Sequence, residues 1–271
     1  MKKVSVIDDL LKNIPGTDER AKVLYMGLYY TGVKFRKLGL AFTYRSCFKV
    51  PHLCPPVRKA GSLLKLQALE MANYLKSENT LEASIGLAAV NSLLEIPEDL
   101  AYGNAIPLLM DICRGRDVAM VGYFPFAEKI REIAKTFFVT EKNRDADEGS
   151  VSKAEIKDFI KRAEIRIITG TTVINHSFDH IMSLCRNGFN ILFGPSVPPT
   201  SILFKHNVDL LVPVTIENEK KVIRAICEPA LVPQMEGLKT ACMAKDKDIL
   251  KRLPPGNFIS FLKNRYPKFN V

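Results

Sequence analysis

Residues 117–142 read DVAMVGYFPFAEKIREIAKTFFVTEK and carry the pattern that decides the fold. The run from Asp117 to Phe124 is mostly apolar, which is typical of a strand buried on both faces. Pro125 suits the first turn of a helix, because a proline there removes no helical hydrogen bond. A second apolar run begins at Phe137. The segment therefore predicts strand, helix and strand in one βαβ unit.

The same alternation continues toward the C-terminus. Three further strands are predicted at residues 165–170, 190–196 and 208–216, and helices at 152–163, 172–186, 201–205 and 219–227. Five strands interleaved with helices predict an α/β fold, in which a Rossmann-like, doubly wound parallel sheet has helices on both faces. Residues 230–271 hold 8 basic against 3 acidic side chains and are expected to form a basic helical extension.

The first part of the chain predicts a smaller α+β unit. Residues 22–45 contain short β-prone runs separated by Thr31-Gly32 and Gly39, which is the pattern of an antiparallel meander. Helices are predicted at residues 5–13, 62–76 and 81–94, the last of them apolar on much of its circumference. We therefore expect two domains, an α+β domain over residues 1–113 and the α/β domain over residues 114–271.

Composition narrows the class of protein. The net charge is +10, but the basic residues are not interleaved with aromatic ones, so nucleic acid is not the expected partner. A basic surface can also attract a small anion. The sequence shows no secretory signal pattern and no apolar run long enough to cross a bilayer, which predicts a cytoplasmic protein without membrane partners. Its six cysteines form no CxxC pair and are expected to be reduced core residues.

Ligands of doubly wound sheets bind beyond the carboxyl ends of the strands, so the turns after the strands hold the candidate site. The first turn has one glycine, Gly122, with Phe124 and Pro125 where a dinucleotide fingerprint needs more glycines, which argues against that binding mode. Phe124 could form a wall for a planar ligand or pack between domains. Glu141 ends the second strand and could bind a ribose hydroxyl or lie in solvent.

The third turn, Thr169-Gly170-Thr171-Thr172, opens the helix predicted at residues 172–186. Hydroxyl groups beside the free amides of a helix N-terminus suit a carboxylate or phosphate, although Thr171 could merely cap the helix. His176 and His180 have the spacing of zinc ligands on a helix. The HExxH pattern is absent and no third ligand is evident, so the anion site is the stronger interpretation of this segment.

Two other segments are candidate sites. The turn Gly194-Pro195-Ser196 follows a buried strand and is expected to shape a ligand pocket, because Ser196 lacks the surroundings of a nucleophile elbow. Cys47, His52 and Cys54 lie close together and are possible ligands of a soft metal. Their spacing fits no standard zinc module, so chance clustering is the simpler explanation.

Several motifs in this order resemble one family. They are IGLAAVNSLL (residues 85–94), VGYFPF (121–126), Glu141, IITGTTVINHS (167–177) and GPSVPPTSILFKHNVDLL (194–211). The chain is similar to a prokaryotic family of unknown function described as "putative heavy-metal chelation", with its usual N-terminal partner domain. The resemblance implies an enolase-N-terminal-like domain, a Rossmann-like domain and a site at their junction. The family's recurrent positions fall on Asn91, Gly122, Phe124, Pro125, Glu141, Thr169, Gly170, Thr171, Thr172, Asn175, Gly194, Pro195 and Ser196, and His176 also fits the pattern.

The leading hypothesis is therefore a protein of metal or metal-cofactor metabolism that binds a small anionic or metal-chelating ligand between its domains. Thr171 and Thr172 would hold an anionic group, and Asn91 and Asn175 would orient the ligand. Glu141 would bind a hydroxyl or, with His176, a divalent transition metal. A homo-oligomer is compatible with the sequence.

Two alternatives belong to other functional classes. One is an enzyme acting on a nucleotide-like or pterin-like cofactor, with Glu141 and the Phe124 wall as its binding groups. The other is a non-catalytic metal carrier or sensor that uses His176, His180 or the cysteine cluster. Whether the protein catalyses a reaction is left open, because no nucleophile or acid–base pair stands out.

Overall fold

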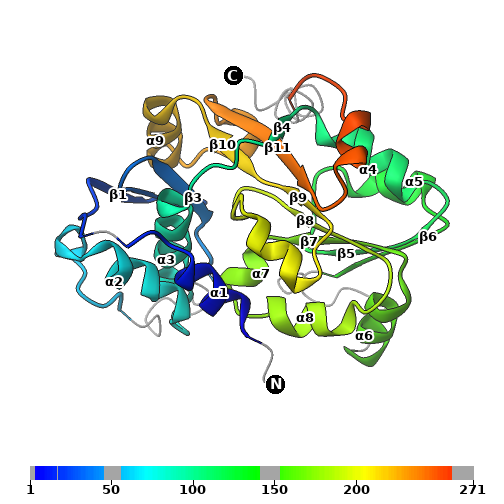
Figure 1. Ribbon diagram of the computed structural model, residues 1–271, viewed down its shortest axis with the longest axis horizontal. Helices are drawn as coiled ribbons and strands as arrows, with labels where there is room; N and C mark the ends of the chain where they lie inside the picture. Colours follow the sequence, from blue (N-terminus) through cyan, green and yellow to red (C-terminus); the bar gives the residue numbers. More distant parts are fainter. Residues whose placement is uncertain (1–3, 17, 46–55, 141–152, 258–271) are drawn as a thin grey trace.

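The computed structural model describes residues 4–16, 18–45, 56–140 and 153–257. In this part of the chain a three-stranded antiparallel sheet lies beside a larger, mainly parallel sheet of eight strands (Figure 1). The protein is therefore a mixed α/β protein with a small α+β part at its N-terminus, as the sequence predicts.

The parallel core of the large sheet contains all five predicted strands. They are β5 (Asp117–Val121), β6 (Thr136–Thr140), β7 (Ile165–Thr169), β8 (Phe189–Phe193) and β9 (Leu210–Val212). Their order in the sheet is β6-β5-β7-β8-β9, and each neighbouring pair is parallel. The direction of winding reverses between β5 and β7, which makes the sheet doubly wound.

The two faces of this sheet are covered by different helices. Val118 and Met120 of β5 pack in one apolar cluster with α4 (Ala105–Cys113) and α5 (Ala127–Ile133), whereas Ala119 packs in the cluster on the opposite face. That face carries α6 (Lys153–Arg162), α7 (Thr171–Ile174), α8 (Phe178–Leu184) and the 3₁₀ helix η5 (Ser201–His206) (Figure 1). Successive residues of each strand therefore point to opposite faces of the sheet and pack against different helices.

The C-terminal part differs from the expected helical extension. Residues Leu238–Ala244 form strand β11, which pairs antiparallel with β9, β10 (Val214–Ile216) and β4 (Ala101–Tyr102). Nearly all of β11 is buried, because it fills the slot between β9 and β10. Only 3₁₀ helices, η6 (Val232–Gln234) and η7 (Lys247–Arg252), flank it, and residues 258–271 lie outside the described part. For residues 230–257 the predicted basic helical extension was wrong.

Two predicted elements are interrupted by local backbone chemistry. Pro213 separates β9 from β10, since proline supplies no N–H to a strand ladder. The helix expected over residues 172–186 is broken between α7 and α8. There Asn175 Oδ1 accepts from Ser177 N at 3.1 Å, and His176 adopts a φ of 57° that a helix does not allow.

The N-terminal part is built around the predicted meander. After α1 (Val6–Lys12), strands β1 (Val23–Met26), β2 (Tyr30–Lys34) and β3 (Leu38–Phe42) pair in antiparallel order. Helix α3 (Thr80–Leu93) covers one face of this small sheet, and α9 (Glu219–Cys227), from the other end of the chain, covers the opposite face (Figure 1).

The helix predicted over residues 62–76 is replaced by three short pieces, η3 (Leu63–Lys65), α2 (Ala68–Ala72) and η4 (Asn73–Lys76). Gln67 is extended there because it forms an isolated β-bridge with Arg20, and Ala68 N donates to Glu19 O at 3.0 Å. Pairing with a distant segment overrides the local helical pattern. No helix in the described ranges is long and apolar enough to cross a membrane.

Two glycines let α3 approach its neighbours with the backbone itself. A Cβ atom at Gly86 would lie 2.0 Å from Leu75 N, and one at Gly39 would lie 2.2 Å from Ala88 O and 2.8 Å from the carbonyl carbon of Asn91. These distances leave no room for a side chain. The register of α3 against β3 and η4 is thereby fixed, and with it the position of Asn91.

Gly86→Ala tests this contact. Helix propensity alone would make alanine more stable than glycine by about 1 kcal/mol. We expect the opposite, a loss of about 2 kcal/mol or more in the free energy of unfolding, because the Cβ would overlap the Leu75 backbone. Urea denaturation followed by circular dichroism measures the change. Gly16→Ala is the matched control, since no heavy atom lies within 4 Å of its Cβ position; equal stability of both variants would refute the close contact.

Candidate functional site

The carboxyl ends of β5 and β7 flank the point where the large sheet reverses its winding. Ligands of doubly wound sheets bind at this point. Gly122 lies just after β5 with a φ of 91°, and a Cβ atom there would be 2.8 Å from Cγ2 of Thr169 at the end of β7. The two predicted turns are thus in direct contact.

The Thr-Gly-Thr-Thr turn satisfies many of its own polar groups. Thr172 Oγ1 donates to Thr169 O at 2.7 Å, Thr171 N donates to Thr169 Oγ1 at 3.3 Å, and Gly170 N donates to Phe193 O at 3.1 Å. Helix α7, which follows, has only four residues. A helix this short has a weak dipole, so the expected anion cradle loses part of its physical basis. The role of the threonines in binding stays a prediction.

The aromatic side chains of the first turn belong to the core. Phe124 stacks on Phe126 with ring centroids 5.4 Å apart, and both meet the ring of Phe193 edge-on. Phe124 and Phe126 are buried, and Pro125 is half-buried between them. Helix α5 begins two residues later than Pro125, at Ala127. This arrangement matches the packing interpretation of Phe124 rather than an open wall.

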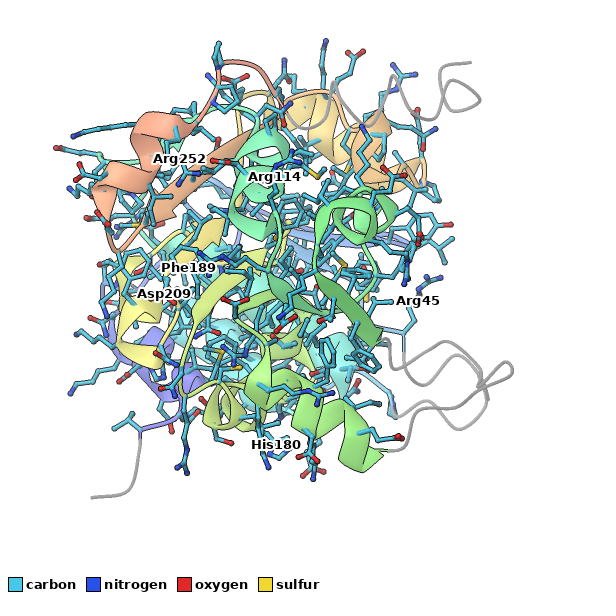
Figure 2. All side chains as sticks on the ribbon, turned by 90° about the vertical axis from the view of Figure 1, so that its right-hand side faces the viewer. Arg45, Arg114, His180, Phe189, Asp209 and Arg252 are labelled. Carbon is cyan, nitrogen blue, oxygen red and sulfur yellow. The ribbon has the colours of Figure 1, made fainter. Side chains whose placement is uncertain are left out.

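The histidines of the opening helix lie in separate elements. His176 is in the break after α7, where its Nε2 donates to Leu75 O at 2.8 Å, whereas His180 lies in α8 and is exposed at the lower edge of the molecule in Figure 2. The i,i+4 spacing of a continuous helix is therefore lost, and the zinc-helix geometry was wrong. Asn175 Nδ2 donates to Tyr44 Oη at 3.1 Å and so connects the turn to the N-terminal part.

The turn after β8 also connects the two parts. Ser196 is buried, and its Oγ accepts from Phe42 N, at the end of β3, at 2.8 Å. Gly194 has a φ of 116°, which favours glycine, and its N donates to Val212 O at 3.0 Å. Ser196 therefore serves as a hydrogen-bond acceptor between the small sheet and the large one.

A cavity of about 70 Å³ lies between these parts, and we call it the junction cavity. Residues from both halves of the chain line it. The polar ones are Lys37, Asn91, Thr215 and Glu219, and Gly39 and Pro195 also contribute. It is smaller than the pockets that enclose drug-sized ligands, so it admits a small molecule or one end of a larger one. Two predicted residues, Asn91 and Pro195, meet here.

Asn91 has an unusual polar environment in this cavity. The side chain is 7% exposed, and its Nδ2 donates to Leu40 O at 2.9 Å. Its Oδ1 is buried and accepts no hydrogen bond from the described residues. Buried polar atoms normally have a partner, so this oxygen marks a place where a hydrogen-bond donor would be stabilised.

Lys37 and Glu219 supply the charges of the junction cavity. Burial lowers the pKa of Lys37 to about 8, although the carboxylate of Glu95 acts in the opposite direction. Burial alone would raise the pKa of Glu219, but the hydrogen bonds from Lys34 Nζ and Leu38 N outweigh it and the pKa is lowered. Sequence reasoning missed Lys37, Thr215 and Glu219. The only available signal was the position of Lys37 in the turn between two strands of the meander.

A second cavity, of about 250 Å³, lies where α1 meets the break between α7 and α8. His176, Asp179, Asp8 and Lys76 contribute to its lining. Asp8 and Lys76 form an ion pair of 2.7 Å, and Asp179 accepts from Val6 N at 3.3 Å. Asp179 thus joins the start of α1 to α8, whereas Lys76 joins α1 to η4. Among the described residues, His176 belongs to no cluster of three side chains that could hold a metal ion.

The described residues do not build a metal site of their own. Within the described ranges, no three His, Cys, Asp or Glu side chains gather in a way that could hold a metal ion. Glu141, Cys47, His52 and Cys54 lie outside these ranges. The convergence of Asn91, Glu141 and Thr171 on one cleft therefore stays a prediction, and Thr171 is not among the residues that line the junction cavity.

Comparison with family models identifies both halves of the chain. The DUF364 model, whose description reads "Putative heavy-metal chelation", matches residues 104–243, which is more than half of the 271 residues. The chain belongs to the DUF364 family. A second model, DUF4213, carries the same description and matches residues 7–94. A comparison with curated proteins finds no match.

Solved DUF364 structures share the fold. A protein of unknown function from Desulfitobacterium hafniense is 22% identical, with a TM-score of 0.75 over 89% of this chain and 98% of that one. A protein of unknown function from Pyrococcus horikoshii is 18% identical, with a TM-score of 0.73 over 88% of this chain and 99% of that one. At these identities the likeness shows the fold alone.

Ser196→Ala tests the connection between the two sheets of this DUF364 protein. We expect the free energy of unfolding to fall by about 1–3 kcal/mol, because Phe42 N would lose its buried acceptor. Thermal or urea denaturation measures the change. Ser183→Ala, at an exposed position of α8, removes a hydroxyl at the surface and is expected to change the stability by less than about 0.5 kcal/mol. If both variants were equally stable, Ser196 would have no such role.

Proposed function

We propose that this DUF364 protein binds a small anionic, metal-chelating molecule in the junction cavity. The observation that carries the proposal is the buried Oδ1 of Asn91, which has no partner among the described residues, in a cavity that Lys37 also lines. An ammonium group and an orphan acceptor in one small cavity are the features of a polar ligand site rather than of a packing defect. Titratable groups with shifted pKa values in clefts are typical of functional sites.

The charges support an anionic ligand. Glu219 is paired with Lys34, so its negative charge is already compensated. Lys37 is thus the lining group that can hold a carboxylate of the ligand. Burial removes part of the water around the Lys37 ammonium group and so makes its charged form less stable. A carboxylate that enters the cavity would stabilise this charged form in place of the lost water.

The metal in this proposal comes from the family description "Putative heavy-metal chelation". The described residues do not fit a bare ion, since they provide no cluster of three ligands. We therefore propose that the protein recognises the chelating molecule and that any metal ion enters with it. The carrier alternative would need residues outside the described ranges. The cofactor-enzyme alternative receives less support, because Phe124 packs against Phe126 and Phe193.

Citrate is the probe for this proposal, because it is a small carboxylate that chelates divalent metals. We expect isothermal titration calorimetry at about pH 7 to detect binding of citrate, with or without Ni²⁺. Lys37→Met should weaken it by about tenfold or more, as the loss of one charge-assisted hydrogen bond implies. Lys205→Met is the matched control, since it removes the same charge from an exposed position outside the cavity. Absence of citrate binding, or equal effects of both substitutions, would contradict the proposal.

The pKa of Lys37 also predicts a pH dependence. The ammonium form exists below about pH 8 and is lost above it, whereas an ordinary lysine stays charged to about pH 10. Affinity for citrate should therefore fall as the pH rises through 8. Lys37→Arg keeps its charge throughout and should remove this decrease. A wild-type affinity that stayed constant up to about pH 9.5 would show that Lys37 does not hold the anion.

A further inference from the structure

We infer that the ligand of the junction cavity is a carboxylic acid with a hydrogen-bond donor on the carbon next to its carboxylate. Lys37 would hold the carboxylate, and Asn91 Oδ1 would accept from the neighbouring hydroxyl or amino group. This inference rests on the proposed function and narrows it to α-hydroxy or α-amino acids. Both classes share the chemistry that the cavity requires.

The orientation of the Asn91 amide is fixed by its other hydrogen bond. Its Nδ2 donates to Leu40 O at 2.9 Å. A flipped amide would point its oxygen at this carbonyl oxygen, where neither atom can donate. The unpaired atom of Asn91 is therefore its acceptor oxygen, and only a group that carries a proton can satisfy it.

The residues lining the cavity leave this acceptor to a ligand. Glu219 is an acceptor itself and is occupied by Lys34 Nζ and Leu38 N. Thr215 Oγ1 donates to Lys239 O, at 3.4 Å. A site with a buried acceptor discriminates strongly against an analogue that lacks the matching hydroxyl or amino group, because the acceptor then stays unpaired.

Lys37 and Asn91 are held in a fixed relation. Ser92, next to Asn91, accepts from Phe35 N at 2.9 Å and donates to Lys37 O at 2.5 Å. The absence of a side chain at Gly39 lets this end of α3 lie directly on β3. The backbone of Lys37 and the end of α3 that carries Asn91 thus meet at one anchored corner of the cavity. Its volume of about 70 Å³ suits the head of a small acid, with one carboxylate and the carbon beside it.

The experiment compares malate, aspartate and succinate, which share a four-carbon dicarboxylate and differ in the group next to one carboxylate. Each competes with citrate for the wild-type protein in calorimetric titrations. We expect malate or aspartate to bind about tenfold more tightly than succinate, which corresponds to one hydrogen bond. Preference for malate would assign a hydroxy acid, and preference for aspartate an amino acid. Equal affinity for all three would overturn the inference.

Variants at the two residues separate their roles. In Asn91→Leu the preference over succinate should shrink to less than about threefold. Lys37→Met should weaken malate, aspartate and succinate alike, since all three carry the carboxylate. Persistence of the preference in folded Asn91→Leu would overturn the assignment to Asn91. If Asn91→Leu does not fold, the wild-type series still decides whether a donor beside the carboxylate is required.

The two proposals fail in different ways. If citrate does not bind to the wild-type protein, the proposed function is wrong and this inference falls with it. If citrate binds through Lys37 but succinate binds as tightly as malate and aspartate, the anion site stands and only the requirement for a neighbouring donor is wrong.

Discussion

The contact between α3 and β3 is the constraint on which the rest of the structure depends. Gly39 brings the two backbones so close that no side chain fits between them. Helix α3 is consequently enclosed on all sides, with every residue from Glu82 to Leu93 buried. A helix in this position must be apolar around its whole circumference, and the few polar residues that it carries must have assigned partners. Asn91 is the exception, because one of its two polar atoms has none.

The junction between the small sheet and the large sheet is polar as well as apolar. Ser196 and Asn175 contact the end of the meander, and Glu219 bonds to both Lys34 and Leu38 N. Between these bonds, α9 packs its apolar face on β2 and β3. The junction cavity is therefore surrounded by connections that hold its two walls together, which is the arrangement that a preorganised ligand site needs.

Local patterns were sufficient for the elements that are buried on both faces. β5, β7, β8 and β9 are short apolar runs and α3 is a long one, whereas the edge strand β6 is only partly buried. The errors have tertiary causes: Gln67 is extended because it pairs with Arg20, and β11 is a strand because β9 and β10 leave a slot for it. The resemblance to the family supplied Asn91, and the turn after the buried strand supplied Pro195. Lys37, Thr215 and Glu219 could not be found in this way, because three separate segments bring them to one cavity.

The position of β11 means that the large sheet is completed late in the synthesis of the chain. Its residues are among the last of the large sheet to leave the ribosome, yet β4, β9 and β10 all pair with it. Until residue 244 has emerged, β10 has no neighbour in the sheet and β9 presents an open edge. Open edges invite pairing with other chains. A chain that ends before β11 would thus expose unpaired strand edges rather than form a shorter version of the finished fold.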